Sequence, residues 1–231
     1  MMKKTATNFV KQAKVWLGVK GGSTSHKKII DLYNAHRPLA HGYELSYTDA
    51  WCAAFISAVS IKLGYTDIIP AECRCSSFIT KFKKLGVWNE DENRKPSVGD
   101  IVFYDWEDSG KGNNKGVPNH VGVVSEVNGD SFTVIEGNKD NKVATRTMNV
   151  DGKLLRGFAI PKYDAEESEP PETLKSESEP SYYIHTVKKG DTLYRLALDN
   201  GTTISAIMEA NADLIKNRNL IRVGWKLKIP K

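Results

Sequence analysis

The residues best suited to chemistry begin with a cysteine at the start of an apolar stretch. Cys52 follows Asp49 by three positions, and the apolar residues after it recur at helical spacing up to Leu63, before Gly64. Asp49 is expected to cap this helix through its carboxylate, which would place Cys52 in the first turn. There the positive end of the helix dipole favours a thiolate, the nucleophilic form of the side chain. A buried, unreactive core cysteine fits the same stretch equally well.

A thiolate nucleophile needs a base and a group that orients the base, and His120 and Glu136 are candidates for these roles. His120 opens a run of strand character, and Asn128-Gly129 predicts a hairpin turn that brings the next strand back beside it. Glu136 or Asn138 would then lie across from His120. The alternatives are a histidine bonded to a backbone carbonyl and a carboxylate on an exposed strand face.

The elements that would hold these residues change from helices to strands along the chain. Apolar residues recur at helical spacing before Pro96 and alternate after it. The expected helices cover 6–18, 26–36, the stretch after Cys52, and 76–85. The expected strands cover 101–104, 120–127, 131–137, 142–150 and 154–160. Helices followed by an antiparallel sheet predict an α+β domain.

A polar segment divides the chain into two bodies. Residues 164–181 carry seven acidic side chains and one lysine, are rich in Glu, Pro and Ser, and lack the apolar residues of a core. We expect a first domain at 1–162, an extended linker at 163–182 and a small βααβ domain at 183–231. Since the formal net charge of the whole chain is +5 and this segment contributes −6, the two bodies together carry +11. Such surfaces suit a polyanion such as nucleic acid, a membrane or a cell wall, but a solvated basic surface with no polyanionic partner is just as common.

Composition narrows the class of protein further. The 231 residues are 40% hydrophobic and 26% charged, as in ordinary globular proteins, and no apolar run reaches the length of a membrane span. The segment after Met1-Met2-Lys3-Lys4 lacks the apolar core of a secretory signal. Three cysteines are too few for a disulfide framework, and Cys73 and Cys75 lack a second ligand pair for a metal. We interpret these two as incidental reduced thiols, with a weak redox pair as the alternative, and expect neither a metal nor a cofactor.

Four motifs occur in an order that points to one family. They are Trp51-Cys52-Ala53-Ala54-Phe55, Val98-Gly99-Asp100-Ile101-Val102-Phe103, Asn119-His120-Val121-Gly122-Val123-Val124 and Ile135-Glu136-Gly137-Asn138. Over residues 5–162 the chain resembles the CHAP family, the cysteine, histidine-dependent amidohydrolases/peptidases. The resemblance implies a papain-like α+β fold and hydrolysis of amide bonds in peptidoglycan. It further implies Cys52 as nucleophile, His120 as base, Glu136 as orienting acid and Asn138 as a supporting polar group.

The resemblance also bears on the surroundings of the nucleophile. The implied oxyanion hole would use the Cys52 backbone N–H and a second donor, for which Tyr47 is a candidate. Some family members bind calcium through an acidic loop ahead of the cysteine. That loop holds only Glu44 and Asp49 here, so no such calcium site is expected. Trp51, Tyr104 and Trp106 would line the substrate groove or belong to the core.

The second body resembles a LysM domain over residues 183–230. The matching motifs are Tyr183 to Ala197, Gly201 to Ile207, Asn211-Ala212 and Asn219 to Pro230. The resemblance implies binding of N-acetylglucosamine chains in a shallow groove. By position its sides would be formed by Gly190, Asp191 and Thr192, and by Asn219, Leu220 and Ile221. For Asp191 and Thr192, helix capping is an equally good interpretation.

Together these patterns predict a peptidoglycan hydrolase that acts as a monomer on stem or cross-bridge peptide, with no nucleic acid or membrane partner. Its activity would be that of an N-acetylmuramoyl-L-alanine amidase or of an endopeptidase. We expect it in the cytoplasm until release to the cell wall, as for a phage endolysin. The alternatives are a host autolysin and, from another class, a wall-binding protein whose catalytic domain is silent.

Overall fold

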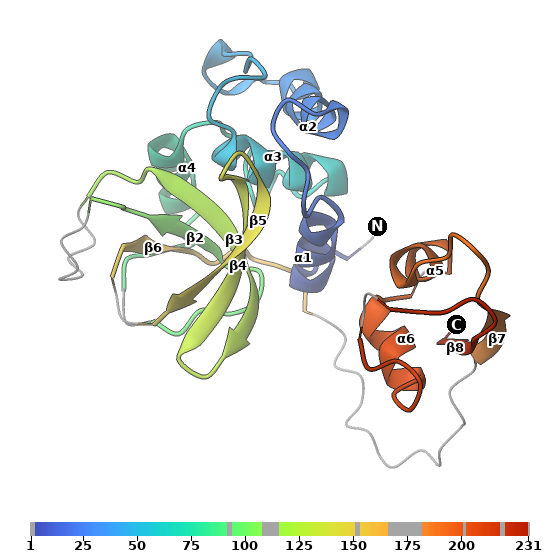
Figure 1. Cartoon of the computed structure of the whole chain (residues 1–231). Coiled ribbons are helices and arrows are strands. Elements are labelled where there is room, and N and C mark those ends of the chain that lie inside the picture. Colours follow the sequence, from blue (N-terminus) through green and yellow to red (C-terminus); the bar gives the residue numbers. More distant parts are fainter. Residues whose placement is uncertain are drawn as a thin grey trace. The chain divides into compact units, whose positions relative to one another are not determined.

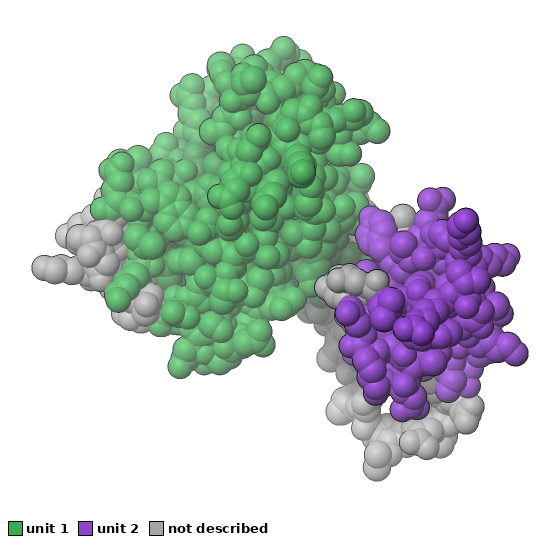
Figure 2. Space-filling model, in the orientation of Figure 1, with its two compact units in different colours: residues 1–167 green, residues 168–231 purple. Residues whose placement is uncertain are grey.

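In residues 1–167 the helices come first and the strands follow, as the computed structural model shows (Figure 1). The structure describes residues 3–91, 94–107, 116–150, 153–165, 182–200, 202–217 and 220–230. The protein divides into two units, Met1–Glu167 and Ser168–Lys231 (Figure 2). Each unit has an apolar core of its own. Within the described residues, no helix combines the length and the apolar character needed to cross a bilayer.

The first unit has an α+β architecture, as predicted. Its helical part consists of α1 (Ala6–Val15), α2 (Thr24–Ala35), the 3-10 turn η1 (Ala40–Gly42), α3 (Cys52–Leu63) and α4 (Cys75–Lys84). Its strands are β1 (Trp88–Asn89), β2 (Ile101–Tyr104), β3 (His120–Asn128), β4 (Ser131–Lys139), β5 (Lys142–Asn149) and β6 (Leu155–Ala159). The strands form one antiparallel sheet of order β1-β6-β2-β3-β4-β5. The two-residue strand β1 was not among the expected strands, because two residues carry no periodicity.

Helix α3 is the central element of this unit. Each of its residues from Cys52 to Ser60 is buried, and the helix contacts α1, α2, β3 and β4. It ends at Gly64, whose φ of 70° lies in the left-handed region that glycine tolerates. A side chain on Gly137 of β4 would begin 2.4 Å from Cβ of Phe55. This glycine therefore lets β4 approach the first turn of α3 closely.

The hairpin of β3 and β4 sets the register of the sheet. Asn128 pairs with Ser131, so the turn consists of Gly129 and Asp130, one residue later than Asn128-Gly129. Gly129 has a φ of 61°, which supplies the left-handed conformation that a two-residue hairpin turn requires. This register places Glu136 directly opposite Gly122.

The second unit is the small βααβ body expected from the sequence. It consists of β7 (Tyr182–Thr186), α5 (Leu193–Asp199), α6 (Ile204–Ala210) and β8 (Lys226–Pro230), with β7 and β8 antiparallel. Asn211 is buried and occupies the C-cap position of α6. Its side chain accepts a hydrogen bond from the Lys228 amide and donates to the carbonyls of Ile207 and Lys228. One amide side chain thus ties α6 to the closing strand.

Candidate active site

Cys52 is the first residue of α3 and is 7% exposed. Trp51 occupies the N-cap position, and no side chain in the described part of the chain caps the helix. The prediction that Asp49 is the cap is therefore wrong. Its carboxylate instead accepts hydrogen bonds from the Ser46 amide at 2.8 Å and the Tyr43 hydroxyl at 3.0 Å, which closes the preceding loop. Helix α3 thus begins without a side-chain cap, and the Ala53 amide in its first turn interacts with the Cys52 sulfur.

His120 and Glu136 are brought together by the register of the hairpin. His120 Nε2 lies 3.1 Å from Oε2 of Glu136, which is fully buried. His120 stands two residues before Gly122, on the same sheet face, and is therefore a diagonal neighbour of Glu136. A Cβ at position 122 would lie 2.9 Å from Cγ of Glu136. The missing side chain thus gives the carboxylate room to reach the imidazole.

Arg146 of β5 holds the other oxygen of the same carboxylate. Its Nε donates to Oε1 of Glu136 at 2.7 Å. Glu136 faces Ala144 on β5, and Arg146 lies two residues beyond, so it too is a diagonal neighbour. Small residues, Gly122 and Ala144, therefore stand directly opposite Glu136 on both sides, and its partners stand diagonally. The expected strand at 142–150 contained Arg146, but nothing in the sequence indicated this role.

Electrostatics favour an ion pair between Cys52 and His120. Contact with Cys75 and a hydrogen bond with His120 lower the pKa of the Cys52 thiol well below its ordinary value, although burial opposes this. Burial also disfavours charge on His120, but its hydrogen bonds to Cys52 and Glu136 raise the pKa of the imidazole to about 9. Since Nε2 is engaged by Glu136, Nδ1 is the ring nitrogen left for the thiol. Thiolate and imidazolium are the favoured forms at neutral pH.

Glu136 stays ionised despite its burial. Burial raises the pKa of this carboxyl, and hydrogen bonds from His120 and Arg146 lower it further than burial raises it. The charge of the imidazolium is thus matched by a fixed anion. In this arrangement a carboxylate orients the base and stabilises its protonated form.

Cys75 is a residue of this site that sequence reasoning missed. Its Sγ lies 3.9 Å from Sγ of Cys52, and all three cysteines are free. Cys73, by contrast, interacts with Tyr33 and Glu72. A separation of 23 residues between Cys52 and Cys75 leaves no periodic signal of their contact. Only the packing of α4 reveals it.

Aromatic rings lie around His120. Tyr104 and Trp106 stack at 4.6 Å between ring centroids, and the Trp106 ring lies 5.9 Å from the imidazole. The Arg146 guanidinium lies 4.7 Å from the Trp106 centroid, within the range of a cation–π interaction. Tyr104 is fully buried and belongs to the core, whereas Trp106 is partly exposed beside the imidazole.

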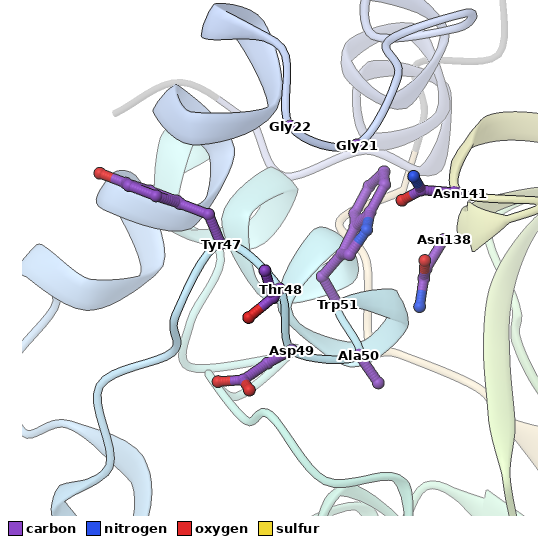
Figure 3. A pocket seen from close by; sticks show the side chains of 9 residues that line it. All are labelled: Gly21, Gly22, Tyr47, Thr48, Asp49, Ala50, Trp51, Asn138 and Asn141. Carbon is purple, nitrogen blue, oxygen red and sulfur yellow. The ribbon is translucent and has the colours of Figure 1, made fainter.

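A pocket of about 560 Å³ opens beside Trp51, the residue that precedes Cys52 (Figure 3). It is lined by Gly21, Gly22, Tyr47, Thr48, Asp49, Ala50, Trp51, Asn138 and Asn141. Asn138 has a φ of 59° and lies where the pairing of β4 with β5 shifts register. In Figure 3 its side chain points towards the Trp51 side of the pocket, so it lines the pocket, and within the described residues no hydrogen bond joins it to His120.

The Tyr47 hydroxyl is engaged away from Cys52. Its hydroxyl donates to Oδ1 of Asp31 at 2.7 Å, and its ring extends away from Trp51 and Asn138 (Figure 3). The structure therefore does not favour Tyr47 as the second oxyanion donor. No group of three or more potential metal ligands occurs among the residues that the structure describes.

The predicted glycan-binding residues of the second unit have structural contacts as well. Oδ2 of Asp191 lies 2.7 Å from Nε2 of His185 and accepts the Lys188 amide at 2.8 Å. Oγ1 of Thr192 accepts the Arg195 amide in the first turn of α5. Gly190 has a φ of 95°, which allows the turn before this helix.

The opposite side of the proposed groove is only partly described. Leu220 is 49% exposed, whereas Ile221 packs against the core of the unit. Asn219 lies outside the described residues. Trp225 also packs against this core.

Comparison with known proteins matches a different domain family to each of the two units. The CHAP domain model matches residues 42–138, and the LysM domain model matches residues 185–230. The chain contains a CHAP domain followed by a LysM domain. The CHAP match includes Cys52, His120, Glu136 and Asn138, but it ends before Arg146. The LysM match includes both predicted sides of the groove.

Two further similarities are partial. An endolysin of Bacillus phage PZA is 47% identical over 45 residues, which make up 20% of this chain and 17% of the endolysin. The chain thus matches less than a fifth of that relative. The crystal structure of Ly7917 is similar with a TM-score of 0.40 and 14% identity, covering 68% of this chain and 62% of that one.

Proposed function

We propose that the protein is a peptidoglycan hydrolase, in which Cys52 of the CHAP domain cleaves an amide bond of the stem or cross-bridge peptide. The single observation that carries the proposal is the connected set Cys52, His120, Glu136 and Arg146. His120 interacts with the thiol on one side and with a buried carboxylate on the other. A core cysteine without a role would not need an oriented imidazolium.

The chemistry proceeds in two halves. The Cys52 thiolate attacks the carbonyl carbon, and the backbone N–H at the start of α3 stabilises the oxyanion. The His120 imidazolium gives its proton to the departing amine, which leaves a thioester on Cys52. Neutral His120 then takes a proton from water, whose oxygen attacks the thioester carbon. The products are a free carboxylic acid and the regenerated thiolate–imidazolium pair. Glu136 keeps the imidazole oriented throughout.

The pocket beside Trp51 supports a peptide substrate. Its lining offers the amide groups of Asn138 and Asn141 and the backbone of Gly21 and Gly22, all suited to hydrogen bonds with peptide groups. Asp49 is the only ionisable acid or base among the pocket-lining residues other than Tyr47. One portion of the substrate peptide would lie here with its scissile carbonyl at Cys52.

The LysM domain would hold the glycan strand while the CHAP domain cuts the attached peptide. Tethering to a polymer raises the local concentration of cleavable bonds, so it raises activity on walls more than on small fragments. The similarity to the phage endolysin supports release to the cell wall during lysis. Whether the bond cut is that of an amidase or of an endopeptidase is read from the new termini of digested peptidoglycan by mass spectrometry.

The proposal is tested by the clearing of purified Gram-positive cell walls, followed as loss of turbidity. Wild type is expected to clear the suspension and Cys52→Ala to leave it turbid, while still binding to the walls. A silent wall-binding protein would bind without clearing in both forms. Equal clearing by both forms would exclude Cys52 as the nucleophile.

A further inference from the structure

Two helices begin at the candidate nucleophile. Cys52 is the first residue of α3 and Cys75 is the first residue of α4, and their sulfur atoms lie 3.9 Å apart. The helices have 12 and 10 residues, so each contributes a positive N-terminal end. This geometry favours one negative charge on the sulfur pair. It disfavours two, because a second thiolate would be repelled at this distance.

The surroundings decide which sulfur carries the charge. Cys52 interacts with the His120 imidazolium and with the backbone amide of Ala53, both of which favour a thiolate. Cys75 faces the Cys52 sulfur and lies near the carboxylate of Glu72, both of which favour its neutral thiol. A neutral thiol beside a thiolate is oriented to act as a hydrogen-bond donor.

We propose that Cys75 is a further catalytic residue of the site, whose S–H group donates a hydrogen bond to the Cys52 thiolate. The inference rests on the proposed role of Cys52 as nucleophile. The donor stabilises the anion before attack, and it loses its charged acceptor once Cys52 is acylated. Its effect is therefore on the fraction of enzyme that carries a thiolate, most strongly on the acid side of the pH range.

The test measures alkylation of Cys52 by iodoacetamide against pH, with peptide mapping to separate the three cysteines. This readout needs no peptidoglycan, so it is independent of whether the protein cleaves cell walls. Cys75→Ala should move the midpoint of Cys52 alkylation upward by about one pH unit. The rate at high pH should not fall, because a thiolate of higher pKa is at least as nucleophilic.

Two variants serve as controls. Cys75→Ser retains a donor and should give a smaller shift than Cys75→Ala. Cys73→Ala removes a thiol that interacts with Tyr33 and Glu72, and should leave the midpoint unchanged. An unchanged midpoint in folded Cys75→Ala would overturn the proposal. So would a fall in the rate at high pH without a shift, since that indicates a displaced site.

If Cys75→Ala does not fold, the contact between the two sulfur atoms is tested by the alkylation of Cys75 instead. In Cys52→Ser the neighbouring thiolate is absent, so the alkylation midpoint of Cys75 should fall towards that of an ordinary thiol. A midpoint for Cys75 equal to that in the wild type would contradict the contact. If wall clearing fails while both midpoints shift as described, the function assignment is wrong and the thiol contact stands.

Discussion

Arg146 and Glu136 share a hydrogen bond of 2.7 Å that leaves only one oxygen of the carboxylate to His120. The carboxylate is thus fixed between two cationic partners on neighbouring strands. A buried carboxylate with one partner could rotate or take up a proton, and the base would lose its orientation. Arg146 is therefore a positioning residue that acts through Glu136.

Removal of the arginine tests this relationship. Arg146→Gln should lower kcat on a soluble muropeptide by about tenfold, equivalent to a loss of about 1.4 kcal/mol of transition-state stabilisation. KM should change little. Without the cation the pKa of Glu136 rises, so the acid limb of the pH–rate profile moves to higher pH. Arg146→Lys keeps the charge and should show a smaller effect. Identical profiles for Arg146→Gln and wild type would show that Arg146 has no part in the site.

The pH dependence follows from the opposite shifts of Cys52 and His120. The pKa of His120 is raised from 6.5 to about 9, and that of Cys52 is lowered, so the ion pair persists between the two values. Activity on a soluble muropeptide should therefore hold through neutral pH and fall above about pH 9, where His120 loses its proton. An alkaline decline centred near 6.5, the ordinary histidine value, would contradict the ion pair.

Glu136→Gln should move the alkaline limb to lower pH, because the imidazolium loses the carboxylate that stabilises it. The measurement is the same pH–rate profile. Glu126→Gln is the matched control, since Glu126 is an exposed carboxylate on the same hairpin that pairs with Lys14. A shift of equal size in the control would indicate a general charge effect instead of a local one.

The small residue opposite Glu136 gives a test of geometry. Gly122→Ala places a Cβ 2.4 Å from Cγ1 of Val134 and 2.9 Å from Cγ of Glu136. We expect a loss of about 1–3 kcal/mol of stability from overpacking and a marked loss of activity as the carboxylate is displaced. Thermal denaturation and turnover measure the two effects.

Gly129→Ala is the control that separates a loss of stability from a loss of activity. Its φ of 61° makes the substitution costly by about 1–2 kcal/mol, but no atom of the described structure lies near the new methyl group. This variant should lose stability and retain turnover at a temperature where it is folded. Equal retention of turnover by Gly122→Ala would show that Glu136 tolerates the shift.

Damage to the second unit should weaken binding to cell walls without lowering the catalytic turnover of the first unit. Asn211→Ala removes three hydrogen bonds in the second unit and leaves partners unsatisfied, at a cost of about 1–3 kcal/mol for each buried group. Sedimentation with purified walls should show weakened binding, while turnover of a soluble muropeptide is retained. Asp199→Ala, at an exposed ion pair with Arg195, should bind as wild type does. Loss of turnover in Asn211→Ala would show that the units depend on each other.

Local patterns in the sequence were enough to predict some features of the site. Helical spacing placed Cys52 in the first turn of a helix, and a hairpin signal brought His120 near Glu136. Both depend on contacts between residues close in sequence, where periodicity and turn chemistry are informative.

Other features depend on packing that no local pattern describes. The contact of Cys75 with Cys52 arises from how α4 packs, and the role of Arg146 depends on the register of β5, which shifts at Asn138. The expected cap, Asp49, closes its own loop instead, because its carboxylate accepts hydrogen bonds from the Ser46 amide and the Tyr43 hydroxyl. Tyr47 similarly bonds to Asp31 of a neighbouring helix.

If the Cys52 sulfur cleaves an amide bond of peptidoglycan, as proposed, each cut releases one free amino group. The most direct measurement is the appearance of new free amino groups when purified peptidoglycan is incubated with wild type or with Cys52→Ala. Wild type should release amino groups in proportion to time, and folded Cys52→Ala should release none. Release of amino groups by Cys52→Ala at the wild-type rate would contradict the role of Cys52 as nucleophile.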